Sequence, residues 1–188
     1  MAQLARLFKD PQLLIFFRDL LDTYQTEKGR GLPIGNLTSQ YFANHYLAVA
    51  DHFLKEQLQA PAVIRYMDDV LIFSKSKEQL SSLVQNYRDY LNRKLLLAVH
   101  APVINKTKYG IPFLGYVVHS SGLRLNRRSK LRYEEKMMQL SAQLGIGDMG
   151  EKEYASRAMC LTAFVTKAHT NGFRRSLACK QGMYLQGL

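Results

Sequence analysis

Two adjacent aspartates, Asp68 and Asp69, are the side chains of this sequence best suited to chemistry, because they interrupt an apolar stretch over residues 62–74. Neighbouring ionised carboxylates repel each other, and a divalent cation removes that repulsion. Mg²⁺ prefers a few carboxylates together with waters and substrate phosphates. The pair therefore predicts a metal site that handles phosphate groups. The alternative is an exposed Asp-Asp turn that holds no ligand.

The surrounding elements must bring both carboxylates to one place. Residues 62–74 predict a β-hairpin with Met67, Asp68 and Asp69 at its tip. Successive strand residues point to opposite faces, so two neighbours share one metal only at a tight turn. A helix over residues 38–58, which Pro61 ends, is expected before the hairpin.

The rest of the chain predicts an α+β lobe followed by a small helical lobe. A capping box at Ser76–Gln79 opens a helix whose apolar face carries Leu80, Leu83, Tyr87 and Leu91. The other expected elements are helices over 1–24 with a break at Asp10-Pro11, strands over 95–100, 111–118 and 123–125, a turn at 119–122, and helices from 127 on, with a weakly patterned basic tail after Gly172.

The charge of the chain is concentrated near its C-terminal end. The formal net charge is +11, of which residues 101–188 contribute +9, and the densest basic segment is Arg124–Arg132. This asymmetry favours a nucleic-acid partner, and a solvated basic helix face is the alternative. No apolar run is long enough to span a bilayer, so we expect no membrane association and a cytoplasmic location. Cys160 and Cys179 fit a reducing compartment, with Cys160 expected to be buried on a helix.

Three sequence blocks in order resemble those of reverse transcriptases. Tyr66-Met67-Asp68-Asp69 resembles their YxDD box, Gly31–Gln40 the block before it, and Phe113-Leu114-Gly115-Tyr116 the later FLG block. The resemblance covers about residues 5–135. Ile34 and Gln40 stand where many related enzymes have Gln and Pro, and this IGNxxSQ form is similar to the enzymes of diversity-generating retroelements.

The resemblance implies RNA-templated DNA synthesis of low fidelity by a two-metal mechanism. It implies a polymerase palm, an antiparallel sheet with packed helices, over residues 1–126, and a thumb-like helical lobe over residues 127–188. The implied cofactor is Mg²⁺, with Mn²⁺ as an alternative. The implied partners are an RNA template, a DNA primer and deoxynucleoside triphosphates.

Roles for individual residues also follow from the resemblance. Asp68 would ligate both metal ions and Asp69 would support one of them, with Tyr66 and Met67 close to the primer terminus. Lys106 would stabilise the pyrophosphate leaving group, although Lys108 is a rival for that role. The pocket for the templating base and the incoming nucleotide would be shaped by Ile34, Gly35, Asn36, Ser39 and Gln40.

The last implied site holds the template–primer duplex. The hairpin at Phe113–Leu125, which begins with Phe113, Leu114 and Gly115, would grip the primer strand, and core packing of Phe113 and Leu114 is compatible with that role. The phosphates of the duplex would be held by Arg124, Arg127, Arg128, Lys130 and Arg132. Asp51 is expected to be a helix-surface acid without a catalytic role.

A third carboxylate is needed in this family, and it normally comes from an upstream block of the D-x-x-x-F-F/Y-x-S-I type. Residues 1–30 do not contain that block, so we expect the chain to lack the fingers and the first catalytic aspartate, and to have little activity alone. The alternatives are a non-catalytic nucleic-acid-binding module or an assembly partner of a larger complex. An exposed sheet edge could also promote a homodimer.

Overall fold

The computed structural model describes residues 1–24, 31–32 and 37–180. The chain divides into two compact units, Met1–Ile104 and Asn105–Leu188. Both units combine helices with small antiparallel sheets, which confirms the expected α+β class. The boundary near residue 126, expected between a palm and a helical thumb, stays a prediction. Among the described helices, none is both long and apolar enough to cross a bilayer.

The first unit begins with the short helix α1 (Leu4–Leu7) and helix α2 (Pro11–Asp22). The expected break at Asp10-Pro11 is confirmed: the Asp10 carboxylate accepts hydrogen bonds from the backbone N–H groups of Gln12 and Leu13, and Pro11 occupies the first helical position. The ring of Phe17 packs edge-on against Phe42, 5.5 Å between centroids, which joins α2 to the next helix.

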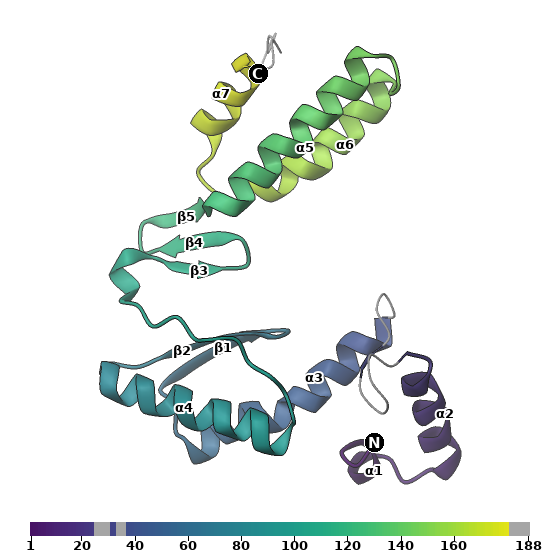
Figure 1. Ribbon diagram of the computed structural model, residues 1–188, viewed down its shortest axis with the longest axis vertical. Helices are drawn as coiled ribbons and strands as arrows, with labels where there is room; N and C mark the ends of the chain where they lie inside the picture. Colours follow the sequence, from purple (N-terminus) through teal and green to yellow (C-terminus); the bar gives the residue numbers. More distant parts are fainter. Residues whose placement is uncertain (25–30, 33–36, 181–188) are drawn as a thin grey trace. The chain divides into compact units, whose positions relative to one another are not determined.

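A helix–hairpin–helix arrangement forms the rest of this unit (Figure 1). Helix α3 (Leu37–His52) continues into a π-helical turn, η1 (Phe53–Gln57), close to the expected range. Strands β1 (Ala62–Tyr66) and β2 (Asp69–Phe73) pair antiparallel, with Tyr66 opposite Asp69. Helix α4 (Lys77–Lys94) follows, and its cap Ser76 accepts a hydrogen bond from the Gln79 backbone N–H as expected.

The core of the first unit lies between the hairpin and helices α3 and α4. Its buried members include Leu54 of the π-helical turn and Tyr87 and Leu91 of α4, and one face of the hairpin adds Val63, Val70 and Ile72. Burial raises the pKa of the Tyr87 phenol to about 12, so the phenol stays neutral at physiological pH.

The strand expected over residues 95–100 is wrong, because the structure has no strand there. Backbone groups of Leu95 and Leu97 bond to helix residues instead. The Leu95 carbonyl accepts a hydrogen bond from the Tyr46 hydroxyl at 2.8 Å, and the Leu97 N–H donates to the Leu91 carbonyl at 3.1 Å. Leu96 between them has a φ of 54°, which is not a strand conformation.

The second unit places a three-stranded sheet before three helices (Figure 1). A 3₁₀ turn, η2 (Thr107–Tyr109), leads into β3 (Ile111–Phe113), β4 (Tyr116–His119) and β5 (Gly122–Leu125), which pair in that order, all antiparallel. Helices α5 (Arg127–Gly145) and α6 (Glu151–Val165) pack side by side, and α7 (Asn171–Lys180) follows. The buried core consists of Leu125, Tyr133, Met137, Leu140, Met149, Val165, Ala168 and Leu177.

Three expectations for this unit need correction. Residues 111–118 form a hairpin rather than one strand, because the chain reverses at Leu114-Gly115. The weakly patterned tail contains α7, which is anchored by the buried Leu177 and by Phe173 against the core. Cys160 is exposed, not buried, because it lies on a face of α6 that the core does not cover.

The Leu114-Gly115 turn requires a glycine at its second position. Both turn residues have positive φ, 50° and 85°, which are the signs of a type I′ turn. A Cβ at Gly115 would lie 2.8 Å from the Ser129 Oγ and 2.9 Å from the Phe164 Cζ. The turn therefore fits closely against α5 and α6.

We predict that Gly115→Ala loosens this hairpin, because alanine disfavours positive φ and its Cβ would collide with Phe164. The local stability should fall by roughly 1–3 kcal/mol. Amide hydrogen exchange of residues 113–118 in the full chain measures the effect. Gly145→Ala is the control, since a Cβ there meets nothing within 4 Å. Equal protection in both variants would contradict the prediction.

A second prediction concerns pH. The folded pKa of Tyr87 is raised from 10.0 to about 12, so its contribution to stability is complete below pH 10 and is lost as the pH rises toward 12. Tyr87→Phe should therefore lose less free energy of unfolding over this interval than the parent chain. Urea unfolding at several pH values tests this, with Tyr109→Phe, an exposed tyrosine, as control. Parallel pH profiles for the parent and Tyr87→Phe would refute it.

Candidate functional site

The two aspartates lie at the tip of the β1–β2 hairpin, as the sequence predicts. Met67 and Asp68 form the two-residue turn, and Asp69 is the first residue of β2, opposite Tyr66. Both carboxylates are exposed, and the Tyr66 side chain beside them is 55 % exposed. The pair is thus presented to solvent at the end of a hairpin whose other end packs into the core.

The turn is conformationally strained. Met67 has a φ of 55°, as the first position of a primed hairpin turn requires. A residue with a Cβ pays about 1–2 kcal/mol to adopt this left-handed conformation. Such a conformation persists where neighbouring groups hold it.

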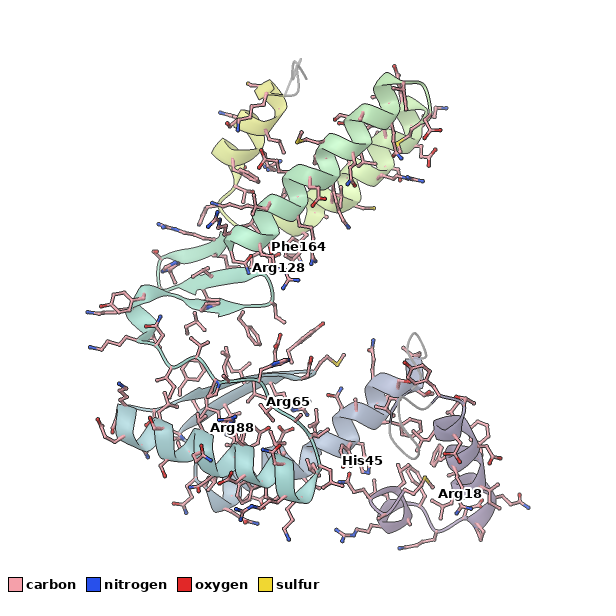
Figure 2. The ribbon with its side chains drawn as sticks, in the orientation of Figure 1. Arg18, His45, Arg65, Arg88, Arg128 and Phe164 are labelled. Atoms are coloured by element: carbon pink, nitrogen blue, oxygen red, sulfur yellow. The ribbon has the colours of Figure 1, made fainter. Side chains whose placement is uncertain are left out.

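Arg65 holds the turn from the inner face of the hairpin (Figure 2). Its Nη1 donates to the Met67 carbonyl oxygen at 2.9 Å and to the Asn44 Oδ1 at 2.8 Å. Its Nε and Nη2 donate to the Asp51 carboxylate, at 2.8 Å to Oδ1 and 2.6 Å to Oδ2. Asn44 and Asp51 both belong to α3, so the guanidinium ties the acidic turn to that helix.

This network corrects the expectation for Asp51, which is not a plain surface acid. The Arg65 side chain is only 14 % exposed, and Asp51 is its ion-pair partner. The hydrogen bonds that Arg65 donates to Asp51 raise the pKa of its guanidinium, which secures the positive charge. Sequence reasoning missed the pair, since the two residues lie on different elements. Their opposite charges beside an apolar hairpin were the available signal.

Asp68 and Asp69 themselves stay available for a ligand. Within the described ranges, neither carboxylate forms an ion pair with a cationic side chain. The described residues also contain no cluster of three or more His, Cys, Asp or Glu side chains suited to a metal. Two exposed carboxylates suit a hard cation such as Mg²⁺ that keeps waters and phosphate oxygens in its remaining positions.

The predicted nucleotide pocket is only partly described. Ile34, Gly35 and Asn36 lie outside the described residues. Ser39 is half-buried and Gln40 is exposed, and both lie in the first turn of α3, the helix that also carries Asn44 and Asp51. The roles of these five residues stay predictions.

Lys106 and its rival Lys108 belong to the second unit. Lys106 is exposed and precedes η2, and its backbone N–H donates to the Asn105 side chain at 2.8 Å. Lys108 places its Nζ 5.1 Å from the centre of the Tyr109 ring, a cation–π contact. This contact engages Lys108 locally, and the choice between the two lysines stays open.

The FLG hairpin of the second unit lines a cavity of about 360 Å³ against α5 and α6. Leu114 and Gly115 form one wall, and Phe113 is half-buried beside them. The Tyr116 hydroxyl donates to the Phe164 carbonyl at 2.7 Å, and the two rings lie 4.7 Å apart. Phe164 (Figure 2) thereby fixes the hairpin to α6.

Basic side chains surround this hairpin. Arg124 projects from β5, and Arg127, Arg128, Lys130 and Arg132 follow on the first turns of α5; all five are exposed. Arg132 and Lys136 line the cavity, and Lys136 is a cavity residue that sequence reasoning missed. Its spacing of four from Arg132 and eight from Arg128 places all three on one helix face, which was the available signal.

Cations at the start of α5 oppose the helix dipole. The first turn of this helix carries no acidic residue and its last turn carries no basic residue, the reverse of what the dipole favours. The N-terminal end of a helix attracts anions, and added arginines strengthen that attraction. The arrangement lowers the stability of the isolated helix and suits a phosphate-rich partner.

The structure therefore brings the predicted residues together in two groups. The acidic turn and the start of α3 lie in the first unit, whereas Lys106, the FLG hairpin and the basic segment lie in the second. The residues of each group lie within one unit.

A known protein family matches most of this chain. The family model described as reverse transcriptase (RNA-dependent DNA polymerase) matches residues 5–118, which include the acidic hairpin and the FLG turn. No curated protein matches the sequence significantly. Because the family model covers more than half of the sequence, this chain belongs to the reverse transcriptase (RNA-dependent DNA polymerase) family.

Proposed function

We propose that the chain is the C-terminal palm-and-thumb portion of a retroelement reverse transcriptase, in which Asp68 and Asp69 hold the metal ions for RNA-templated nucleotidyl transfer. The observation that carries this proposal is the exposed carboxylate pair at a hairpin tip that Arg65 fixes to α3. Family membership supplies the reaction class, and the free carboxylates supply ligands of the required kind.

In this proposal each carboxylate has its own task. Bound Mg²⁺ or Mn²⁺ supplies the activation of the primer hydroxyl and the neutralisation of the triphosphate. Asp68, in the turn, would hold both ions, and Asp69, at the strand start, would help to hold one of them. Tyr66 and Met67 contact the primer terminus. The strained turn at Met67 sets where these two residues and the two aspartates lie relative to that terminus.

The second unit would hold the duplex. The exposed cations of β5 and α5 bind phosphates of the RNA–DNA hybrid, which positions the substrate without reading its sequence. Leu114, 40 % exposed on the tight FLG turn, contacts the primer strand. Lys106 is assigned to the pyrophosphate leaving group, with Lys108 as the alternative.

The diversity-generating subtype stays part of the proposal. An apolar Ile34, where related enzymes have an amide, removes a hydrogen-bond donor from the nucleotide pocket. Loss of that readout would lower fidelity, since a hydrogen-bonding site rejects wrong partners more strongly than an apolar one.

The direct test of the proposal is metal binding. We expect the 188-residue chain to bind Mn²⁺, and Asp68→Asn to weaken this binding by at least about tenfold, because a neutral amide replaces an anionic ligand. Electron paramagnetic resonance of free Mn²⁺ measures the affinity. Asp148→Asn, at an exposed loop position between α5 and α6, is the control and should leave the affinity unchanged.

The dependence of Mn²⁺ binding on Asp68 and Asp69, rather than primer extension, separates the proposal from its alternative, because both give little extension. We expect little extension by the isolated chain, because the described residues place no third acidic ligand beside the pair. Mn²⁺ binding that ignores Asp68 and Asp69, together with retained hybrid binding, would instead support a non-catalytic nucleic-acid-binding module.

A second test concerns the duplex-binding surface. Arg128→Gln and Arg132→Gln should each weaken binding to an RNA–DNA hybrid and reduce the slope of log affinity against log salt by about one. Fluorescence anisotropy over a series of KCl concentrations measures the slope. Arg157→Gln, whose side chain pairs with Glu153 at 2.6 Å on α6, is the matched control. A slope unaltered in all three variants would rule out this surface.

A further inference from the structure

We infer that Arg65 is a positioning residue for the metal site, and that Asp51 and Asn44 keep its guanidinium directed at the backbone of the acidic turn rather than at the acidic side chains. The inference rests on the proposed metal-binding role of Asp68 and Asp69. It assigns to three residues outside the YxDD box a function in the geometry of that box.

The contact at the Met67 carbonyl is what links Arg65 to the site. That carbonyl belongs to the peptide unit that joins Met67 to Asp68, and the Arg65 Nη1 donates to it at 2.9 Å. Because a peptide unit is planar, holding its oxygen also restricts the direction in which the Asp68 Cα leaves it. The contact thus acts on the placement of the Asp68 carboxylate without touching it.

The guanidinium is itself held in place by α3. The Nε and one Nη2 hydrogen serve Asp51, and the two Nη1 hydrogens serve Asn44 and Met67, so only one of its five N–H groups is left. Asn44 and Asp51 are seven residues apart, two turns along the same face of α3. A rigid helix face therefore sets the position of the turn.

The charge of Asp51 has a separate consequence for the carboxylates. Arg65 lies only three residues before Asp68, and an unpaired guanidinium there could bind one of the aspartates in place of a metal ion. The ion pair with Asp51, at 2.6 Å, occupies the Nε and Nη2 groups of this guanidinium. Within the part of the chain that the structure describes, Asp68 and Asp69 form no ion pair with it.

Lysine cannot replace arginine in this arrangement. An ammonium group has no planar fork, so it cannot bind Asp51 in two places and reach Asn44 and Met67 together. Arg65→Lys therefore keeps the charge and removes the geometry, which separates a positioning role from a purely electrostatic one.

The test measures Mn²⁺ affinity in the full 188-residue chain by electron paramagnetic resonance, with the hydrogen exchange of the Asp68 amide as a second readout. Arg65→Lys and Asp51→Asn should each lower the affinity about tenfold, the lower end of what outer ligand partners contribute. Both should also speed exchange of the Asp68 amide. The double variant should lose no more than either single variant, since both changes break one network.

Two further variants keep the test decisive. Arg88→Lys is the matched control, because Arg88 is another half-buried arginine of the same unit and lies on α4 (Figure 2), outside the hydrogen-bond network that Arg65 forms with Asp51, Asn44 and Met67. Its affinity should equal that of the parent chain. Asn44→Ala removes one exposed anchor and is expected to fold even where Arg65→Lys does not, with a smaller loss of affinity.

The outcomes distinguish this inference from the proposed function. Parent chain that binds Mn²⁺ through Asp68, together with unchanged affinity and unchanged Asp68 amide exchange in folded Arg65→Lys, Asp51→Asn and Asn44→Ala, overturns the inference alone. Parent chain whose Mn²⁺ binding ignores Asp68→Asn overturns the proposed function and the inference with it. Loss of affinity in Arg88→Lys equal to that in Arg65→Lys also overturns the inference, because it would show a general loss of stability.

Discussion

The bond from the Arg65 guanidinium to the Met67 carbonyl is the interaction on which the acidic turn depends. Met67 occupies a left-handed conformation that costs a methionine free energy, and the Arg65 bond, next to the Tyr66–Asp69 pairing, helps to hold it. Asp51 and Asn44 of α3 hold the Arg65 guanidinium, so the position of the turn is set by a helix. The carboxylates are thereby exposed and yet fixed at their backbone.

The second unit also contains a tight turn with positive φ, but other contacts stabilise it. Its FLG turn also uses positive φ, but Gly115 accommodates it at little cost, and the turn is held by close contact with Ser129 and Phe164. The cationic start of α5 lies in the same unit, where it opposes the helix dipole. The proposed phosphate-binding role would use this exposed charge at the expense of the stability of the helix end.

Sequence reasoning was most reliable where a local pattern decides the structure. The apolar runs around Asp68 and Asp69, the cap at Ser76 and the break at Asp10-Pro11 each depend on neighbouring residues, and the structure confirms all three. The Leu114-Gly115 reversal was missed although a glycine marked it, because the flanking residues look like one continuous strand.

The errors arose where distant contacts decide. Residues 95–100 have strand-like composition, yet the backbone of Leu95 and Leu97 bonds to Tyr46 and Leu91 of the neighbouring helices. Arg65 and Asp51 are fourteen residues apart on two different elements, so no repeating sequence pattern predicts that they pair. The pocket around Ile34, Gly35 and Asn36 lies outside the described residues and stays a prediction of the family resemblance.

Paramagnetic broadening by Mn²⁺ in the amide NMR spectrum of the full chain tests the central claim most directly, because it reports where the ion lies. The account predicts that substoichiometric Mn²⁺ first broadens the amides of residues 66–70 at the hairpin tip. Broadening centred on other acidic segments, such as the first turn of α6 with Glu151 and Glu153, and absent from the hairpin tip, would contradict it.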